Sequence, residues 1–311
     1  MTAVPRRRTE PTVEEKFLAA ANGSTAPLDT KHRIFLGDAR EMAELTDPES
    51  VHLVVTSPPY WTLKTYDGAA GDQQLGHFAG YEGFHDELDK VWRRCYDLLV
   101  PGGRMCVVVG DVCLPRKKAG RHLVMPLHAD ISVRCRRIGF DYLTPILWYK
   151  IANAATEVEG NGSPFLGKPY EPNAIIKNDV EYILLLRKPG GYRNPTPEQR
   201  QRSLIDKESH PRWFRALWSD VPGQSRLLGH PAPFPTELAY RLVRMFSFVG
   251  DIVLDPFLGT GTTTEAAIKA ERSSVGYEIE PKYLDIVRER FTQLPLGAEL
   301  TIKTPRRRSS R

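Results

Sequence analysis

A glycine- and threonine-rich segment near the carboxyl end constrains the fold of this chain more than any other part of its sequence. The segment reads DPFLGTGTTT from residue 255 to residue 264, between an apolar run at 252–254 and a helical pattern at 262–271. Glycines at the exit of a buried strand let a ligand approach the backbone, and the following helix offers unpaired N–H groups. The segment therefore predicts a ligand-binding turn in an α/β sheet.

Apolar runs and helical patterns alternate through most of the chain, as they do in α/β proteins. Strands are expected at 33–36, 52–56, 104–109, 142–149, 180–187, 252–254 and 274–277, and helices at 81–99, 127–138, 236–247, 262–271 and 282–293. The Pro-Gly-Gly at 101–103 is expected to form a turn. The alternation predicts a mostly parallel, Rossmann-like sheet with helices on both faces.

Three regions lack this regular pattern. Residues 1–30 are expected to form a flexible basic arm with one short helix near 13–21, and residues 297–311 a basic tail. Residues 151–228 are rich in Gly, Pro, Asn and charged residues, and are interpreted as an insertion. The insertion separates two halves of one domain, at 31–150 and 229–296.

The composition of the 311 residues is that of an ordinary globular protein, with 41% hydrophobic residues and a formal net charge of +5. No apolar run approaches the roughly 20 residues of a membrane-spanning helix, and the amino end carries no secretory pattern. The four cysteines lack the spacing of a zinc site. We therefore expect a cytoplasmic protein that binds neither a membrane nor a metal.

The distribution of basic residues is more informative than the net charge. They cluster at 6–8, 116–121, 134–137 and 306–311, and between 187 and 215 they are interleaved with Tyr192, Trp213 and Phe214. Basic and aromatic side chains together suit phosphates and bases. Candidates for contacts to phosphates or guanine are Arg193, Arg200, Arg202, Arg212 and Arg215. Solvated surface charge is the alternative interpretation of any single cluster.

The glycine-rich segment differs from the two common phosphate-binding motifs. It lacks the Gly-Lys-Ser/Thr of a Walker loop, and Thr264 stands where a dinucleotide-binding loop has its last glycine. A nucleoside ligand without phosphates fits better. Glu278 ends the next expected strand, 19 residues after Gly259, close to the spacing at which an acidic residue binds ribose hydroxyls. Asp255 is expected to meet an ammonium group, and a plain tight turn is the alternative to a ligand site.

A second loop, TSPPYW at 56–61, follows an expected strand and is therefore expected at the carboxyl edge of the sheet. The loop offers hydrogen-bond acceptors of the kind that a reaction at an exocyclic amine would need. Such an amine is a poor nucleophile because its lone pair is delocalised into the ring, so acceptors for its N–H bonds favour reaction. Ser57 offers a side-chain oxygen and Pro58 a fixed carbonyl, which Pro59 stiffens. Tyr60 is suited to stack on a base rotated out of the duplex. Taken alone, this string is typical of an ordinary turn.

The two loops together resemble those of the amino-methylating DNA methyltransferases. DPFLGTGTT is similar to the S-adenosylmethionine motif of that family, HPAPFP at 230–235 to the segment before it, and SPPY at 57–60 to its catalytic motif. SPPY precedes DPFLGTGTT here, as in the circularly permuted β group. Gly37-Asp38-Ala39 resembles the strand-end motif near the cofactor adenine, although Asp38 is also a candidate helix cap. The resemblance spans about residues 31–293.

The resemblance implies a fold, a cofactor and a set of site residues. The fold is a Rossmann-like S-adenosylmethionine-dependent methyltransferase with 151–228 as the target-recognition region, and the catalytic residues are Ser57, Pro58, Pro59 and Tyr60. The cofactor-binding residues are Asp38, Ala39, His230, Pro231, Phe234, Pro235, Asp255, Pro256, Phe257, Gly259, Gly261, Thr262, Thr263 and Glu278. The implied partner is double-stranded DNA, and a cognate restriction endonuclease and a homodimer are left open.

The first residue of the catalytic motif bears on the target base. Adenine enzymes of the family usually carry Asp or Asn there and cytosine N4 enzymes usually carry Ser, so Ser57 favours cytosine N4, with adenine N6 as the alternative. An RNA methyltransferase and a non-enzymatic DNA-binding protein of this fold are further hypotheses. A nicotinamide-dependent oxidoreductase is disfavoured because the last glycine is absent. No cysteine follows Pro58 to support covalent methylation of a ring carbon.

Overall fold

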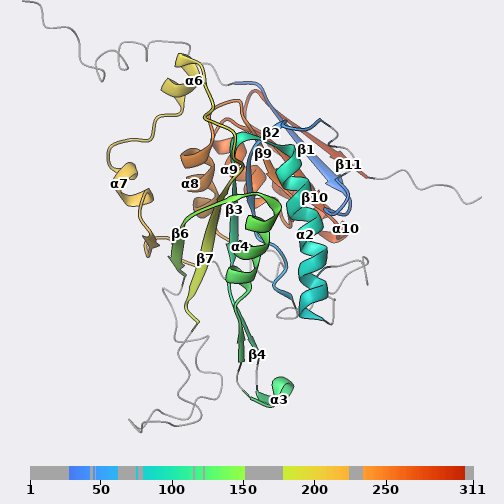
Figure 1. The fold of residues 1–311 in the computed structure, drawn as a ribbon. Helices are drawn as coiled ribbons and strands as arrows, with labels where there is room; N and C mark the ends of the chain where they lie inside the picture. Colours follow the sequence, from blue (N-terminus) through green and yellow to red (C-terminus); the bar gives the residue numbers. More distant parts are fainter. Residues whose placement is uncertain are drawn as a thin grey trace, which may run out of the picture.

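A computed structural model shows an α/β fold and describes residues 28–42, 45, 47–61, 75, 80–114, 116–121, 123–150, 178–223 and 234–304. Its centre is a nine-stranded sheet with the order β11-β1-β10-β9-β2-β3-β7-β6-β8 (Figure 1). The strands are β1 (Thr30–Leu36), β2 (Val51–Thr56), β3 (Leu99–Val109), β6 (Asp141–Tyr149), β7 (Val180–Arg187), β8 (Leu217–Trp218), β9 (Ile252–Asp255), β10 (Ser273–Glu278) and β11 (Ala298–Lys303). Neighbouring strands are parallel, except that β7 is antiparallel to both β3 and β6.

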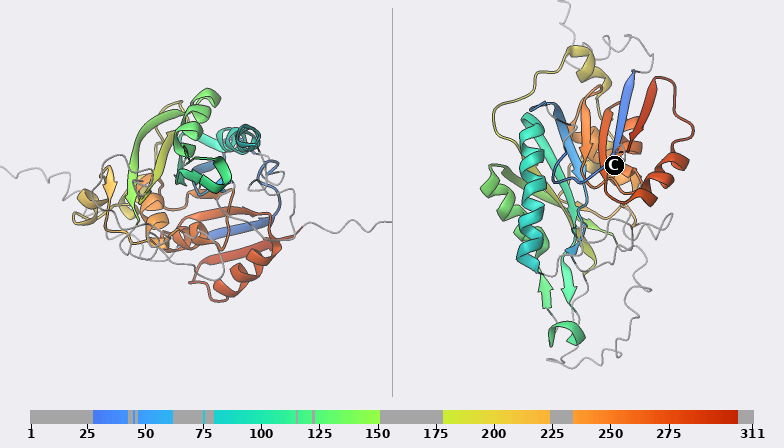
Figure 2. Two further views of the ribbon diagram at one scale, coloured as in Figure 1. Left: turned by 90° about the horizontal axis from the view of Figure 1, so that it is seen from below. Right: turned by 90° about the vertical axis from the view of Figure 1, so that its right-hand side faces the viewer.

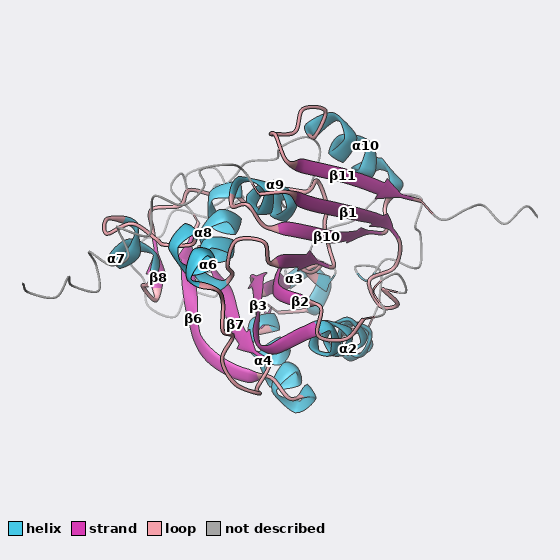
Figure 3. Ribbon diagram, turned by 90° about the horizontal axis from the view of Figure 1, so that it is seen from above, coloured by secondary structure: helices cyan, strands magenta, loops and turns pink. Residues whose placement is uncertain are grey.

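Helices cover both faces of the sheet (Figures 2 and 3). Helices α2 (Tyr81–Leu98) and α4 (Leu127–Ile138) lie on one face, and α8 (Thr236–Phe246), α9 (Thr262–Lys269) and α10 (Pro281–Arg290) on the other. The shorter elements are α3 (Arg116–Ala119), α6 (Pro197–Arg202) and α7 (Ser209–Trp213), and a separate hairpin of β4 (Val112–Leu114) and β5 (Leu123–Met125). The mostly parallel α/β architecture expected from the alternating pattern is confirmed.

The side chains of β3 show how one strand serves both faces. Met105, Val107 and Val109 belong to the core beneath α2 and α4, whereas Cys106 and Val108 belong to the core beneath α8 and α9. All of these side chains are fully buried, as the two-residue period of a strand requires when helices cover both faces. The central strands therefore appear in the sequence as continuous apolar runs, which is why they are predictable.

Most expected elements lie at or near their expected bounds, and the helix at 127–138 and the strand at 180–187 agree at both ends. The prediction of a turn at 101–103 was wrong, because these residues lie inside β3. Val51 of β2 pairs with Leu99, but Leu53 pairs with Arg104. The Pro-Gly-Gly segment is thus accommodated as a bulge, and the strand continues through it.

The region at 151–228 differs from the expected insertion in its described part. Strand β7 lies between β3 and β6 in the central sheet, and β8 pairs with β6 at the edge. The apolar run at 180–187 buries its backbone by pairing on both sides, so the main sheet continues into this region. Residues 151–177 and 224–233 lie outside the described residues.

The carboxyl end also contributes a strand where a tail was expected. Strand β11 pairs in parallel with β1, and its Leu300 and Ile302 pack in the core with α10 while Glu299, Thr301 and Lys303 are exposed. This alternation is typical of a strand with one solvated face. Residues 305–311, the arm at 1–27 and the short helix expected within it lie outside the described residues.

The bulge in β3 predicts a large effect of a small substitution. Gly102 has a φ of +77°, and a Cβ atom there would lie 2.4 Å from the carbonyl oxygen of Gly191. We expect Gly102→Ala to lower the free energy of unfolding by about 2–4 kcal/mol, because left-handed strain adds to a backbone clash. Urea denaturation measures the loss.

The matched control for this substitution is Gly83→Ala in α2. Gly83 is exposed, and a Cβ atom there would meet nothing within 4 Å. We expect no loss and a gain of up to about 1 kcal/mol, since alanine restricts the unfolded chain and favours a helix. Equal effects of the two substitutions would contradict the geometry of the bulge.

Candidate active site

Residues 57–61, which we call the reaction loop, and residues 255–261, the cofactor loop, follow adjacent parallel strands. Strands β2 and β9 pair through Leu53 with Val253 and through Val54 with Leu254. After β2 the chain passes to α2 on one face of the sheet, and after β9 it passes to α9 on the other face. The loops therefore diverge where the winding of the sheet reverses, which is where open α/β sheets bind ligands.

A buried carboxylate joins the two loops. Asp255 at the end of β9 is 1% exposed, and its Oδ1 accepts hydrogen bonds from Thr56 Oγ1 at 2.7 Å and from the Phe257 N–H at 3.0 Å. Its Oδ2 accepts a hydrogen bond from Thr263 Oγ1 at 2.6 Å. Thr56 is the last residue of β2, and Thr263 lies in the first turn of α9. One side chain thus fixes the end of β2, the cofactor loop and the start of α9.

A second carboxylate organises the other side of the cofactor loop. Glu278 at the end of β10 is 8% exposed, and it accepts hydrogen bonds from the backbone N–H groups of Gly259 and Glu280, each at 2.8 Å. Its carbonyl oxygen accepts a hydrogen bond from the Gly37 N–H at 2.9 Å. The ends of β1, β10 and β9 therefore lie together at the same edge of the sheet.

Asp38 and Ala39 follow β1 at this edge. Ala39 is buried in the core, and Asp38 Oδ1 accepts a hydrogen bond from the Arg40 N–H at 2.9 Å. The Arg40 guanidinium pairs with Asp38 and, at 2.8 Å, with Glu87 of α2. The Asp38 side chain thus closes a turn with the backbone of Arg40, and about a quarter of it is open to solvent (24%).

The start of α9 requires a glycine. Gly261 precedes the first residue of the helix with a φ of +86°, and a Cβ atom there would lie 2.9 Å from Phe291 Cε2. A side chain is therefore excluded both by the backbone conformation and by the packing of Phe291. Thr262, which follows, is buried, so the cofactor loop turns directly into the helix without a projecting side chain.

The charge at this edge suits a cationic ligand. Burial raises the pKa of Glu278 to about 7 and the pKa of Asp255 to about 6, although the hydrogen bonds that they accept favour the ionised forms. No cation is among the main causes of either shift, and the charges of Asp255 and Glu280 raise the pKa of Glu278 further. Positive charge on a ligand would stabilise both carboxylates. S-adenosylmethionine carries a sulfonium and an ammonium group, so these residues fit it.

A chain of hydrogen bonds holds the reaction loop against the sheet. Ser57 Oγ donates to Tyr60 Oη at 3.4 Å, and Tyr60 Oη donates to Glu181 Oε2 at 3.2 Å. The other carboxylate oxygen of Glu181, a residue that is 8% exposed, accepts a hydrogen bond from Lys150 Nζ at 2.7 Å. The bonds run from the reaction loop to β7 and to the residue after β6, so these strands help to position the loop.

The aromatic residues of the reaction loop are packed. The Tyr60 ring is 7% exposed and belongs to the core beneath α2 and α4. Trp61 packs edge-on against Tyr81 at the start of α2, with ring centroids 5.1 Å apart. Pro58 is buried and Pro59 is half-buried. The roles expected for these residues with a substrate base stay predictions.

Three of the residues in this arrangement were not singled out from the sequence. Thr56 and Lys150 carry no local signal, because their partners Asp255 and Glu181 are distant in the chain. Glu181 carries a weak one, since it is a lone acidic residue in the apolar run VEYILLLR at 180–187. A buried acid in a central strand needs a partner, and this requirement could have pointed to it.

The residues expected before α8 are described in part. Phe234 is 9% exposed, and Pro235 precedes the first residue of α8. The next residue, Thr236, donates a hydrogen bond to Glu265 Oε2 of α9 at 2.9 Å, so the start of α8 lies beside the first turns of α9. His230 and Pro231 lie outside the described residues.

The arginines expected to contact DNA are not brought to the two loops. Arg193 pairs with Asp251, which is 1% exposed and precedes β9, and Arg202 pairs at 2.8 Å with Glu271, which lies close before β10. These pairs lie at the opposite edge of the sheet, where β9 and β10 begin. Arg212 pairs with Asp220, and Arg215 donates a hydrogen bond to the Pro211 carbonyl. Arg200 donates a hydrogen bond to the side chain of Asn194. Their contact with DNA stays a prediction.

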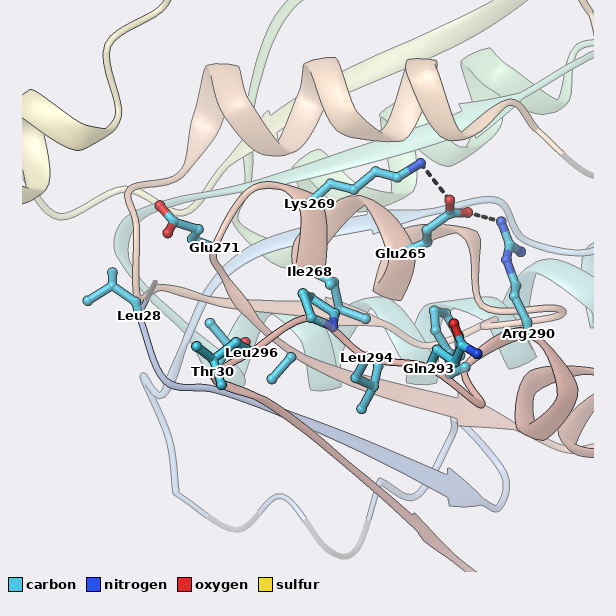
Figure 4. Close-up of a pocket in the computed structure, with 13 residues that line it drawn as sticks. Leu28, Thr30, Glu265, Ile268, Lys269, Glu271, Arg290, Gln293, Leu294 and Leu296 are labelled. Atoms are coloured by element: carbon cyan, nitrogen blue, oxygen red, sulfur yellow. Dashed lines mark hydrogen bonds and ion pairs between the residues drawn. The ribbon is translucent and has the colours of Figure 1, made fainter. Parts of the chain in front are cut away.

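A pocket of about 500 Å³ lies apart from this site (Figure 4). Its walls come from α9, α10 and the amino ends of β1 and β11, and include Ile268 and Leu294 together with the ion pairs of Glu265 with Arg290 and Lys269. It shares no residue with the reaction loop or the cofactor loop. This pocket is therefore separate from the candidate active site.

Among the residues that the structure describes, no group of three or more His, Cys, Asp and Glu side chains is arranged to hold a metal ion. None of the helices seen in that part of the chain combines the length and apolar character that crossing a membrane requires.

Comparisons with known proteins agree with this geometry. The family model of the N6/N4 DNA methylases matches residues 51–289. The type II methyltransferase M.MjaI of Methanocaldococcus jannaschii is 39% identical over 303 residues, covering 89% of this chain and 97% of that protein. A Thermus thermophilus protein, a DNA modification methylase by its description, was solved with S-adenosyl-L-methionine and is 52% identical with a TM-score of 0.72, covering 87% of this chain and 97% of that one.

A more distant structure shares the fold. The PvuII DNA methyltransferase (cytosine-N4-specific) is 21% identical with a TM-score of 0.57, covering 85% of this chain and 88% of that one. The family match extends over most of the chain and includes both the reaction loop and the cofactor loop. The chain therefore belongs to the N6/N4 DNA methylase family and is an S-adenosylmethionine-dependent DNA methyltransferase.

Proposed function

We propose that the protein transfers the methyl group of S-adenosylmethionine to the exocyclic N4 amine of a cytosine rotated out of duplex DNA. The observation that carries the choice of base is Ser57, which stands where similar cytosine N4 enzymes usually have Ser. Ser57 directly follows β2, beside the strand that leads into the cofactor loop. Adenine N6 is the alternative, because both amines are conjugated to a ring and need the same geometry.

The reaction needs the lone pair of the amine to point at the methyl carbon. In the proposal, Ser57 Oγ and the Pro58 carbonyl oxygen accept hydrogen bonds from the two N–H groups, which holds the nitrogen in that orientation. The nitrogen bonds to the methyl carbon as the carbon–sulfur bond breaks, and the sulfur leaves as a neutral thioether with the electron pair of that bond. The nitrogen then loses one proton to water and becomes a neutral amine again. The bound cofactor supplies a methyl group activated by positively charged sulfur, so the chain contributes orientation rather than a covalent nucleophile.

The remaining roles follow from the ends of the strands. We assign Glu278 to the ribose hydroxyls, Asp38 to the adenine side and Asp255 to the ammonium group of the cofactor. The Glu278 carboxylate accepts hydrogen bonds from two backbone N–H groups, and a carboxylate can accept about four. The remaining capacity supports its proposed role with the ribose hydroxyls. The order of the two loops in the chain supports assignment to the permuted β group. Residues of 151–228 outside the sheet are proposed to recognise the DNA sequence.

Mass spectrometry of the methylated nucleoside tests the proposed base. The protein is incubated with labelled S-adenosylmethionine and unmethylated bacterial genomic DNA, which is then digested to nucleosides. We expect N4-methylcytosine, and we expect Ser57→Ala to lower kcat about 100-fold because the amine loses an oriented acceptor. N6-methyladenine would refute the assigned base but leave the cofactor site intact, and methylation of RNA instead of DNA would refute the proposed substrate.

The buried carboxylates predict that cofactor affinity depends on pH. A cationic ligand binds the ionised forms more strongly, so affinity rises as the pH passes the pKa of about 6 for Asp255 and about 7 for Glu278. Binding near the lower of these values releases protons. Calorimetry of S-adenosylmethionine binding between about pH 5 and about pH 8 measures both effects. An affinity independent of pH would contradict the assignment.

The stability of the ligand-free protein has the opposite dependence. Both carboxylates hold their protons to higher pH in the folded protein than at their ordinary pKa values of 3.8 and 4.5. Their contribution to stability is therefore greatest at low pH and falls as the pH rises between about 4 and about 7. Comparing the wild type with a single variant isolates this contribution from that of other titrating groups.

Asp255→Asn is the variant that changes charge and keeps shape. Its amide oxygen can still accept hydrogen bonds from Thr56 and Phe257, and the Thr263 hydroxyl can rotate to accept one from the amide nitrogen. We expect the unfolding free energy of this variant to lose the part of its pH dependence that Asp255 contributes below about pH 6. We also expect the variant to bind S-adenosylmethionine about tenfold more weakly at high pH.

Substitutions of Tyr60 and Glu181 are expected to lower turnover and to leave cofactor affinity unchanged. Tyr60→Ala removes the proposed stacking ring and the link between Ser57 and Glu181, so we expect kcat to fall about 100-fold with cofactor affinity retained. Glu181→Gln can still accept the Tyr60 hydrogen bond and should retain most of the rate that Glu181→Ala loses. Single-turnover methylation and calorimetry separate the two quantities. Similar losses of cofactor affinity in Tyr60→Ala and Asp255→Asn would contradict this division of roles.

A further inference from the structure

A two-stranded hairpin projects beyond the edge of the sheet that carries the reaction loop. Strands β4 and β5 pair from Val112 with Met125 to Leu114 with Leu123, and α3 lies between them in the chain. In Figure 1 the hairpin extends below the sheet, past the end of β3, and Figure 2 shows the same projection from the side. We call residues 112–125 the basic hairpin.

The tip of the basic hairpin is exposed and positively charged. Arg116, Lys117 and Arg121 are exposed, and the sequence from 112 to 129 contains neither Asp nor Glu. Across the described parts of the chain, no ion pair involves these three side chains. Arg134 of α4, by contrast, pairs with three acidic side chains of α2. The charge on the tip therefore does not hold the fold together, and it suits an anionic partner.

The base of the basic hairpin is anchored in the same core as the reaction loop. Val112, its first residue, and Leu127, the first residue of α4 just after it, are fully buried in the core that includes Tyr60. His128 Nδ1 and Asp111 Oδ1 are 2.7 Å apart, and the His128 ring stacks on Tyr182 of β7 with centroids separated by 3.7 Å. A hairpin anchored in this way has a defined direction relative to the site.

A second set of contacts connects this base to the reaction loop. Trp61 packs against Tyr81, and Tyr81 Oη donates a hydrogen bond to Asp130 Oδ2 at 2.7 Å. Asp130 lies in the first turn of α4, directly after the hairpin. The reaction loop, α2 and the hairpin base are thus linked by direct contacts, and the charged tip projects beyond them.

We propose that the basic hairpin binds the phosphates of duplex DNA beside the target base and so positions the duplex against the reaction loop. The inference rests on the proposed function, because it takes duplex DNA as the substrate. Duplex DNA carries one charge per about 1.7 Å of its axis, so neighbouring cations on one tip can each meet a phosphate. The hairpin contains no Phe, Tyr or Trp, which agrees with contact to the backbone rather than to bases.

A triple variant, Arg116→Gln/Lys117→Gln/Arg121→Gln, tests this inference. The matched control is Arg136→Gln/Arg137→Gln, which removes exposed charges from the other end of α4. Methylation of genomic DNA fragments and fluorescence anisotropy with duplex DNA are measured between about 50 and 200 mM salt. We expect the triple variant to raise KM and Kd for DNA about tenfold or more and to reduce the salt slope of log Kd by up to about 3. Its kcat at saturating DNA, its cofactor affinity and all values of the control should stay within about twofold of wild type.

Two outcomes would overturn the inference. One is a triple variant with the same DNA affinity and salt slope as the control, and the other is a loss of kcat without a loss of DNA affinity. If the wild type methylates RNA and not DNA, the proposed function fails, but anisotropy still decides the role of the hairpin. Duplex affinity that depends on the tip would then support phosphate binding by the tip but overturn its placement beside a target base, and affinity that does not depend on the tip would refute both.

Discussion

The hydrogen bonds of Asp255 hold the reaction loop and the cofactor loop in a fixed arrangement. Its carboxylate is buried at the end of β9, bonds to Thr56 at the end of β2, and bonds to Thr263 in α9. A methyl transfer depends on the separation and angle of the two reacting atoms, to which small displacements are costly. Since one loop is proposed to hold the amine and the other the methyl donor, this carboxylate fixes the geometry on which the reaction depends.

The sheet makes this geometry independent of the order of the loops in the chain. Thr56 and Asp255 are 199 residues apart, yet the parallel pairing of β2 with β9 brings their strands together. Any connection that preserves this pairing delivers both loops to the same edge, because parallel strands end on the same side. A permuted chain can therefore build the same site, and the identity of the neighbouring strands matters more than sequence order.

Features encoded by local pattern were predictable, and features that depend on distant partners were not. The continuous apolar runs predicted the central strands, and glycines between a strand and a helix predicted the turn from β9 into α9. Strand β11 was missed because its alternating AELTIK segment leads into a basic end, and only its pairing with β1 distinguishes it from a tail. The neighbours of β7 and the partners of Glu181 arise from the folded sheet. A lone acid in an apolar run indicates that a partner is needed, but it does not identify that partner.

The arrangement of charge separates the two edges of the sheet. At the edge where β9 and β10 begin, Arg193 and Arg202 are neutralised by Asp251 and Glu271. At the opposite edge, where the two loops lie, the basic hairpin presents cations beyond them. A net charge of only +5 attracts a polyanion weakly. The distribution of the charged residues therefore decides which face of the protein the polyanion meets. Because the field of exposed cations acts over about 10 Å at ordinary salt, a projecting tip reaches phosphates before the loops meet a base.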